Sequence, residues 1–293
     1  MKTRQYTDWT GRTRQDYDSM AAETMKRFAA TMDRDPARIM DDDPLTPCAH
    51  WFYFTPMERL GELAQDGHPH KGDFLPPIDL PRRMWAGGRV RPLAPLRTGT
   101  PATKTSTITK IEPKQGRSGA LCFITVVHRV EQEGRLCVEE EQDIVYREAA
   151  PAGIAPRRNQ PLEQRPDWSV RWEPTATQLF RFSAITFNAH RIHYDADYCR
   201  EVEGYPNVVV HGPLLLHRIL HDFSEKYPAR CITAIRYRAM GPVYLGEQVE
   251  VGGTDGPEEH KEGFRAGVTT MVVSGQENAI AMQAELTWEE GTP

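Results

Sequence analysis

The sequence predicts an α+β fold in which an antiparallel sheet wraps a helix, and in which this unit occurs twice in one chain. Strand-like alternation of apolar and polar residues dominates 103–146 and returns in 231–288. A strongly apolar helical segment precedes the second set of strands. The two halves also share landmarks at a similar spacing, since residues 95–99 read PLRTG and residues 242–246 read PVYLG. We infer a diverged internal duplication.

Composition narrows the functional classes. A chain of 293 residues exceeds a typical single domain, and a net charge of -5 gives no electrostatic reason to expect nucleic-acid binding. No apolar run approaches the roughly 18 residues of a membrane span, and the first residues lack a secretory core. The five cysteines form no CxxC pair, which favours reduced thiols. We expect a cytoplasmic protein that binds a small molecule or another copy of itself.

The first half begins with helical periodicity over 16–32, and a second short helix is expected over 57–63. Residues 66–96 carry many prolines and glycines, so we expect an ordered, irregular lid or pocket wall. Three strands then follow, separated by turns. The expected strands are 103–111, 120–130 and 136–146, with turns at 114–119 and 131–134.

A segment biased towards Pro, Ala and Gly separates the halves. We therefore predict an N-terminal domain over 1–150, a linker over 151–166 and a C-terminal domain over 167–293. The C-terminal domain should open with a short apolar segment and continue with strands after its helix. These strands are expected at 231–238, 246–252, 265–274 and 279–288.

The helix of the second half starts at Gly212–Pro213 and ends near Tyr227, and its apolar stripe indicates burial inside a sheet. The first N–H groups of a helix have no partner within it and point outward along a favourable dipole. Gly212 could therefore donate to a thioester oxygen that becomes an enolate. Alternatively, Gly212–Pro213 is only a helix start.

Several segments carry a resemblance to a known family. Residues 183–195 (SAITFNAHRIHYD), 203–206 (EGYP) and 210–215 (VHGPLL) resemble the MaoC-like double hot-dog hydratases and dehydratases. The first half agrees at 74–78, 82–88, 114–119 and 142–148. Within the family the chain looks most similar to itaconyl-CoA and mesaconyl-C4-CoA hydratases and to mitochondrial-type hydroxyacyl-thioester dehydratases. The resemblance implies a double hot-dog fold, with a degenerate N-terminal half that walls the substrate and a catalytic C-terminal half.

The resemblance also assigns roles. The family motif is Asp-x-Asn-x-x-His, and here Asn188 falls at the Asp position, His190 at the Asn position and His193 at the His position. His193 would be the base, His190 a second acid/base group, and the N–H of Gly212 would hold the enolate oxygen. Asn188 can orient a water or an imidazole but cannot accept a proton.

The predicted substrate-binding residues come from both halves. Arginines are suited to the free carboxylate of a dicarboxylyl-CoA, although these arginines could instead contact CoA phosphates or surface acids. In and beside the motif, Ser183 and Arg191 could position reacting groups. His211, next to the helix start, could cap the helix or pack against it. The predicted set is Arg82, Arg83, Trp85, Gly87, Gly88, Ser183, Arg191 and His211.

No cofactor is expected, because no P-loop or GxGxxG motif occurs and CoA would enter as part of the substrate. We expect no metal either. His217 and His221 lack a third ligand, and His68 and His70 suit a pocket rim. Three functions follow: a hydratase making citramalyl-CoA, a 3-hydroxyacyl-thioester dehydratase, or a non-catalytic thioester-binding module. A monomer with an internal pseudo-dimer and a homodimer are both compatible with the sequence.

Overall fold

The computed structural model describes residues 6, 8–116, 119–148, 161–261, 263–275 and 278–291, and its strands form one antiparallel sheet. The strands of the first half are β1 (Thr13–Asp18), β2 (Arg82–Pro92), β3 (Ala102–Gly116), β4 (Gly119–Gln132) and β5 (Arg135–Arg147). Those of the second half are β6 (Trp168–Trp172), β7 (Cys231–Ala239), β8 (Val249–Asp255), β9 (Glu259–Lys261), β10 (Phe264–Ser274) and β11 (Ile280–Gly291).

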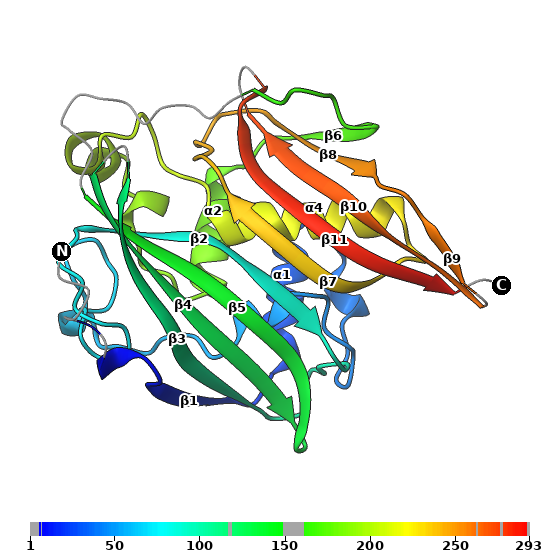
Figure 1. Ribbon diagram of the computed structural model, residues 1–293, viewed down its shortest axis with the longest axis horizontal. Coiled ribbons are helices and arrows are strands. Elements are labelled where there is room, and N and C mark those ends of the chain that lie inside the picture. Colours follow the sequence, from blue (N-terminus) through cyan, green and yellow to red (C-terminus); the bar gives the residue numbers. More distant parts are fainter. Residues whose placement is uncertain are drawn as a thin grey trace.

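The two halves meet where β2 pairs with β7, with Gly87 opposite Arg238 and Val90 opposite Ile235. Read outward from this seam, the strand order is β5, β4, β3, β1 on one side and β11, β10, β8, β6 on the other. The same order of strands therefore occurs twice, and the two copies lie side by side in one sheet (Figure 1). This repeat confirms the predicted α+β class.

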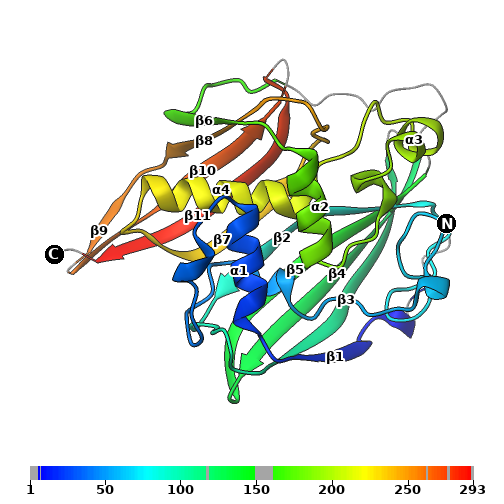
Figure 2. The same cartoon turned by 180° about the vertical axis from the view of Figure 1, so that it is seen from behind.

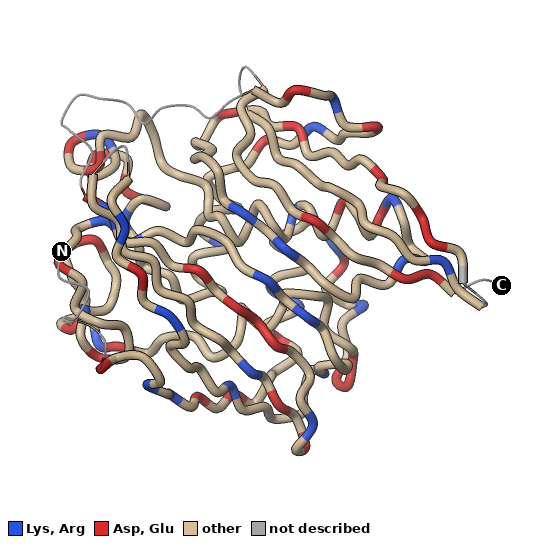
Figure 3. Tube along the Cα trace, viewed as in Figure 1, with Lys and Arg blue, Asp and Glu red and all other residues tan. Residues whose placement is uncertain are grey.

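The helices cover one face of the sheet (Figure 2). They are the α-helices α1 (Ala22–Thr31), α2 (Ala176–Ile185), α3 (Ala196–Tyr198) and α4 (Gly212–Lys226), with the π-helical turn η6 (Cys199–Glu203). The 3-10 helices are η2 (Pro36–Arg38), η3 (Ala49–Phe52), η4 (Leu60–Glu62) and η5 (Arg191–His193). On the sheet, acidic and basic residues are interspersed along the strands (Figure 3), in pairs such as Arg89 with Glu141 at 2.8 Å.

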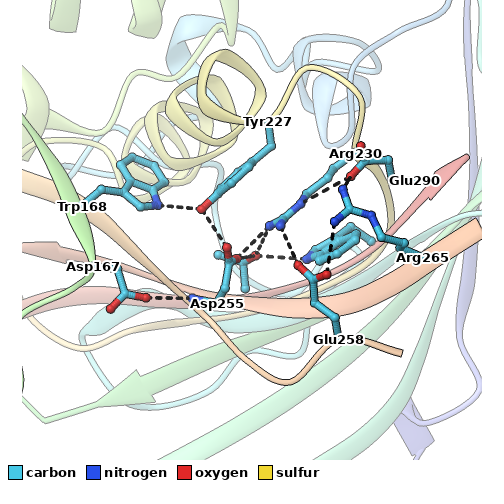
Figure 4. A network of polar contacts seen from close by, with 10 residues as sticks. Asp167, Trp168, Tyr227, Arg230, Asp255, Glu258, Arg265 and Glu290 are labelled. Atoms are coloured by element: carbon cyan, nitrogen blue, oxygen red, sulfur yellow. Dashed lines mark hydrogen bonds and ion pairs between the residues drawn. The ribbon is translucent and has the colours of Figure 1, made fainter. Parts of the chain in front are cut away.

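Helix α4 fills the concave face of the second half, as the sequence predicted. Its apolar stripe packs against β8, β10 and β11, and Leu214, Leu216, Ile219 and Phe223 are fully buried. Beyond its end, the hydroxyl of Tyr227 donates to Asp255 at 2.9 Å, and Arg230 pairs with the same carboxylate at 2.8 Å (Figure 4). This network fastens the end of α4 to the sheet.

The first half has no counterpart of α4 among its described residues. Helix α1 is ten residues long and packs against α2 and η3. The predicted helix over 16–32 begins at Ala22 instead, because Thr13–Asp18 pairs with β3 as strand β1. The predicted helix over 57–63 is reduced to η4.

Strand β2 corrects the prediction of an irregular segment over 66–96. Residues 82–92 pair with β5 on one side and β7 on the other, with a bulge at Ala86. Its glycines, which suggested irregularity, are needed for close packing within the sheet. A Cβ atom on Gly87 would lie 2.6 Å from the carbonyl oxygen of Tyr237. Only the parts before and after β2 are irregular.

The predicted linker falls largely on residues 151–160, which lie outside the described residues, so the domain boundaries stay a prediction. The described strands β1 to β5 precede that segment and β6 to β11 follow it. All five cysteines are free thiols. No helix in the described part of the chain has the length and apolar character to cross a membrane.

Candidate active site

A cavity of about 1860 Å³ runs between the two halves. Its walls include Trp85 from β2, the loop with Asp66 and His68, the motif residues Asn188, His190 and His193, and the start of α4 at Gly212. The predicted motif and the predicted first-half wall therefore border the same space.

His193 lies in η5 with its ring at the cavity. Its Nδ1–H donates to the carbonyl oxygen of Val209 at 2.8 Å, and this leaves a lone pair on Nε2. Burial lowers the pKa of His193 to about 4, despite the hydrogen bond to Val209. The ring is therefore neutral near pH 7 and able to accept a proton.

His211 supports the ring of His193 from behind. The two imidazoles stack with centroids 3.8 Å apart, and His211 is only 1% exposed. Its Nε2 hydrogen-bonds to Ser183 Oγ at 2.8 Å. Since His211 immediately precedes Gly212, this stack brings the His193 ring to the start of α4. His211 and Ser183 thus form a support, with Ser183 also reaching the cavity wall.

Gly212 begins α4 and is followed by Pro213 at the first turn. Trp85 explains why this position suits glycine, because an added Cβ would lie 2.7 Å from its indole ring. Trp85 in turn stacks on Tyr237 with ring centroids 4.5 Å apart. A side chain from the first half therefore sits against the proposed N–H donor of the second half.

Asn188 does not act as a free polar group. Its Oδ1 accepts the backbone N–H of His190 at 3.0 Å, which closes a turn in the motif. The ring of His190 lies between two other imidazoles, 3.9 Å from His68 and 5.4 Å from His193. Burial and then the neighbouring histidines lower the pKa of His190 to about 2.

The sequence did not reveal Asp66 as part of this site, and it placed His68 at a pocket rim. The carboxylate of Asp66 accepts both the backbone N–H and the ring Nδ1–H of His68, each at 3.0 Å. Asp66 and His190 are 124 positions apart in the chain, so no local spacing joins them. Gly67 permits this approach, because its positive φ and its lack of a Cβ let the loop backbone lie against Ala189.

The predicted substrate-binding residues divide into two groups. Trp85, Arg83, Arg82 and Ser183 line the cavity. Arg82, however, pairs with Glu203 at 3.0 Å and is only 11% exposed, so its charge is already matched.

Three others serve the fold. Gly87 and Gly88 lie where β2 approaches Tyr237 of β7 closely, and neither glycine borders the cavity. Arg191 pairs with Asp195 at 2.7 Å and stacks over Tyr198, and it too lies outside the cavity wall. These residues hold the site in place.

The first-half end of the cavity is polar. Glu140 is 2% exposed and accepts hydrogen bonds from His50 Nε2 at 2.7 Å and Trp51 Nε1 at 2.9 Å. Its other oxygen is buried without a hydrogen-bond partner among the described residues. Lys104 and His128 border the same end. Together with these polar groups, apolar side chains of the first half, such as Phe74 and Leu75, line the cavity.

Known proteins share the sequence and the fold. A family model described as hydroxyacyl-thioester dehydratase type 2 matches residues 48–245. The chain is 44% identical over 247 residues to a mesaconyl-C(4)-CoA hydratase of Chloroflexus aurantiacus, which covers 83% of this chain and 87% of that relative. It is 27% identical over 232 residues to a mitochondrial hydroxyacyl-thioester dehydratase type 2 of Schizosaccharomyces pombe, covering 71% and 77% of the two chains.

Among solved structures, a MaoC-like dehydratase from Phytophthora capsici matches over 100% of both chains with a TM-score of 0.67 at 14% identity. This similarity confirms the double hot-dog fold that the sequence predicted.

Proposed function

Because the chain belongs to the hydroxyacyl-thioester dehydratase type 2 family, we propose that it is an acyl-CoA hydratase, a hydro-lyase that adds water to a short unsaturated dicarboxylyl-CoA. A substrate of the mesaconyl-C4-CoA type would give citramalyl-CoA. The 44% identity to a mesaconyl-C(4)-CoA hydratase, over most of the chain, supports this choice of substrate. The observation that carries the proposal is the neutral imidazole of His193 held beside the start of α4.

The proposed reaction uses His193 as the base. Its Nε2 takes a proton from water as the water oxygen bonds to the carbon β to the thioester. The π electrons move to form an enolate, whose oxygen accepts the N–H of Gly212. The imidazolium of His193 then returns the proton to the α carbon, which restores the neutral base. Asn188 keeps the His190 backbone in position and transfers no proton.

Arg83 is the proposed partner of the free carboxylate. In mesaconyl-C4-CoA this carboxylate is bonded to the carbon that takes the hydroxyl, so its partner must lie close to the base. The guanidinium of Arg83 lies near enough to lower the pKa of His68 and of His190 by its charge, although burial is the main cause of both shifts. Among the described residues Arg83 forms no ion pair, whereas Arg82 pairs with Glu203.

The dehydratase alternative requires room for a long acyl chain. The cavity, which apolar side chains such as Phe74 and Leu75 also line, has that room. The higher identity to the mesaconyl-C(4)-CoA hydratase, 44% against 27%, favours the hydratase instead. A non-catalytic binding module is disfavoured because His193 keeps a free Nε2 at the cavity.

A hydration assay over three thioesters tests the proposal: mesaconyl-C4-CoA, crotonyl-CoA and a long-chain enoyl-CoA. We expect the highest kcat/KM for the dicarboxylyl substrate. His193→Ala should lower kcat at least about 100-fold, because it removes the general base. His260→Ala, an exposed histidine of β9 that lies outside the cavity wall, is the matched control. Near-native turnover by His193→Ala would reject the assigned base, and a preference for the long chain would favour the dehydratase.

A further inference from the structure

The motif of the second half lacks a carboxylate, and the structure brings one to it from the first half. We propose that Asp66 takes the place of the motif carboxylate: it holds His68 against His190 and supplies the negative charge that balances an imidazolium during proton transfer. The inference rests on the proposed hydratase function. Asp66 and His68 act through His190 and His193, so both are positioning residues.

The loop that carries Asp66 is fastened to the motif by its backbone. The N–H of Arg191 donates to the carbonyl oxygen of Asp66 at 2.9 Å, and the Arg191 guanidinium donates to the carbonyl oxygen of Gln65 at 3.3 Å. Gly67 has φ +88°, and a Cβ there would lie 1.8 Å from the carbonyl oxygen of Ala189. This contact excludes any side chain at position 67. The loop is therefore shaped to reach the motif.

The side chains continue this contact into the cavity. Asp66 accepts the Nδ1–H of His68 at 3.0 Å, so the lone pair of His68 is on Nε2. The ring centroids of His68 and His190 are 3.9 Å apart, and those of His190 and His193 are 5.4 Å apart. Asp66 thus lies at one end of a row of three imidazoles, and the proposed base, His193, lies at the other end.

Charge around this row favours an acid/base unit over a metal. Asp66, His68 and His190 offer ligand-type atoms within 4.8 Å of one another. A dication there would also lie near the Arg83 guanidinium, whose charge already acts on both histidines and on Lys71. Protonation of one imidazole introduces one positive charge, which the Asp66 carboxylate can balance.

The consequence for the reaction concerns the step that makes His193 cationic. When His193 takes a proton from water, the buried cluster gains a positive charge. The carboxylate of Asp66 lowers the free energy of that charge, and the same carboxylate fixes the tautomer of His68. The family motif places this carboxylate within the motif itself, where this chain has Asn188.

Kinetics of Asp66→Asn test the inference, since the amide keeps the shape and an acceptor but not the charge. We expect kcat to fall about 10- to 100-fold with KM within about threefold, because binding contacts remain. The acid limb of the kcat/KM profile should move to lower pH, since loss of the negative charge disfavours imidazolium. The titratable and charged groups that face Asp66, His68, His190 and His193 are Arg83, Lys71, His211, Tyr146 and Tyr198. Asp33→Asn, an exposed acid of the first half that lies outside the cavity wall, is the control and should keep wild-type kinetics.

A second measurement separates this inference from the proposed function. Nitrogen NMR of the histidine rings in the wild type should show His68 as the Nδ1–H tautomer, and Asp66→Asn should lower the imidazole pKa values. If the wild type hydrates no thioester, the proposed function fails. The NMR measurement still tests whether Asp66 fixes the tautomer of His68 and raises the imidazole pKa values. Unchanged ring signals, wild-type kcat in Asp66→Asn, or loss of wild-type activity to a chelator with recovery on adding zinc would each overturn the inference.

Discussion

The two halves repeat the same strand order but fill their concave faces differently. In the second half, α4 lies along the sheet and buries Leu214, Leu216 and Phe223 completely. In the first half, the corresponding stretch between α1 and β2 holds three short 3-10 helices and irregular loops. Polar groups, led by the Glu140–His50 pair, border a cavity there.

This difference explains how one chain makes a site from a repeated fold. The half with the long helix supplies a rigid helix start and the proposed base. The half without it supplies space, a wall and the charged groups Asp66 and Arg83. A structural core and an open pocket cannot occupy the same concave face, so the two halves divide these tasks. The comparison can be challenged in each half.

The largest stability effect is expected in the second half. Phe223→Ala removes a fully buried ring from α4 and should lower the free energy of unfolding by about 3–5 kcal/mol. Denaturant unfolding followed by circular dichroism measures this. Phe180→Ala is the control, because Phe180 is 69% exposed and should cost less than about 0.5 kcal/mol. Equal losses in the two variants would contradict the assigned core.

A smaller effect on activity is expected from the wall of the first half. Arg83→Met keeps much of the side-chain length but removes the charge. We expect kcat/KM for mesaconyl-C4-CoA to fall about 10- to 100-fold, the cost of one charged hydrogen bond, with little change for crotonyl-CoA. An equal loss on both substrates would mean that Arg83 contacts the CoA moiety or positions the histidines instead of binding the carboxylate.

The smallest effect is expected for the buried carboxylate of the first half. Burial opposes ionisation of Glu140, but the hydrogen bond and charge of His50 outweigh it and hold the pKa at about 2, below the ordinary value of 4.5. A depressed folded-state pKa contributes stability above pH 4.5 that is lost as pH falls towards 2.

Glu140→Gln should therefore destabilise the protein by about 1–3 kcal/mol at pH 7 and flatten the stability profile between pH 4.5 and 2. Glu141→Gln, on an exposed ion pair with Arg89, serves as the control with an effect below about 1 kcal/mol. A profile as steep as the wild type's would show that another acid governs this range.

The sequence predicted those parts of the fold that have long periodic signals. The apolar run of α4 and the meander of β3, β4 and β5 are of this kind, and both are confirmed. Strand β2 was mistaken for a loop because its glycines and nearby prolines are local breaker signals. The sheet on both sides of β2 outweighs them, since the close approach of β7 selects small residues.

The site was predicted where it is contiguous in sequence. His193, His211 and Gly212, which belong to one segment of the sequence, lie together through a stack of two rings. Asp66 and His68 are brought to the motif by tertiary packing across the two halves, and a single sequence contains no signal for that pairing. The sequence predicts the same role for Arg82 and Arg83, but Arg82 pairs with Glu203, whereas the charge of Arg83 acts on His68 and His190.

The seam between β2 and β7 has an evolutionary consequence. An assembly of two identical subunits carries every substitution twice, so a change that opens a pocket on one side also removes a core on the other. Joining both copies in one polypeptide ends that constraint, and each copy can then accumulate its own substitutions. The pairing of β2 with β7 keeps the two copies in the same relative position.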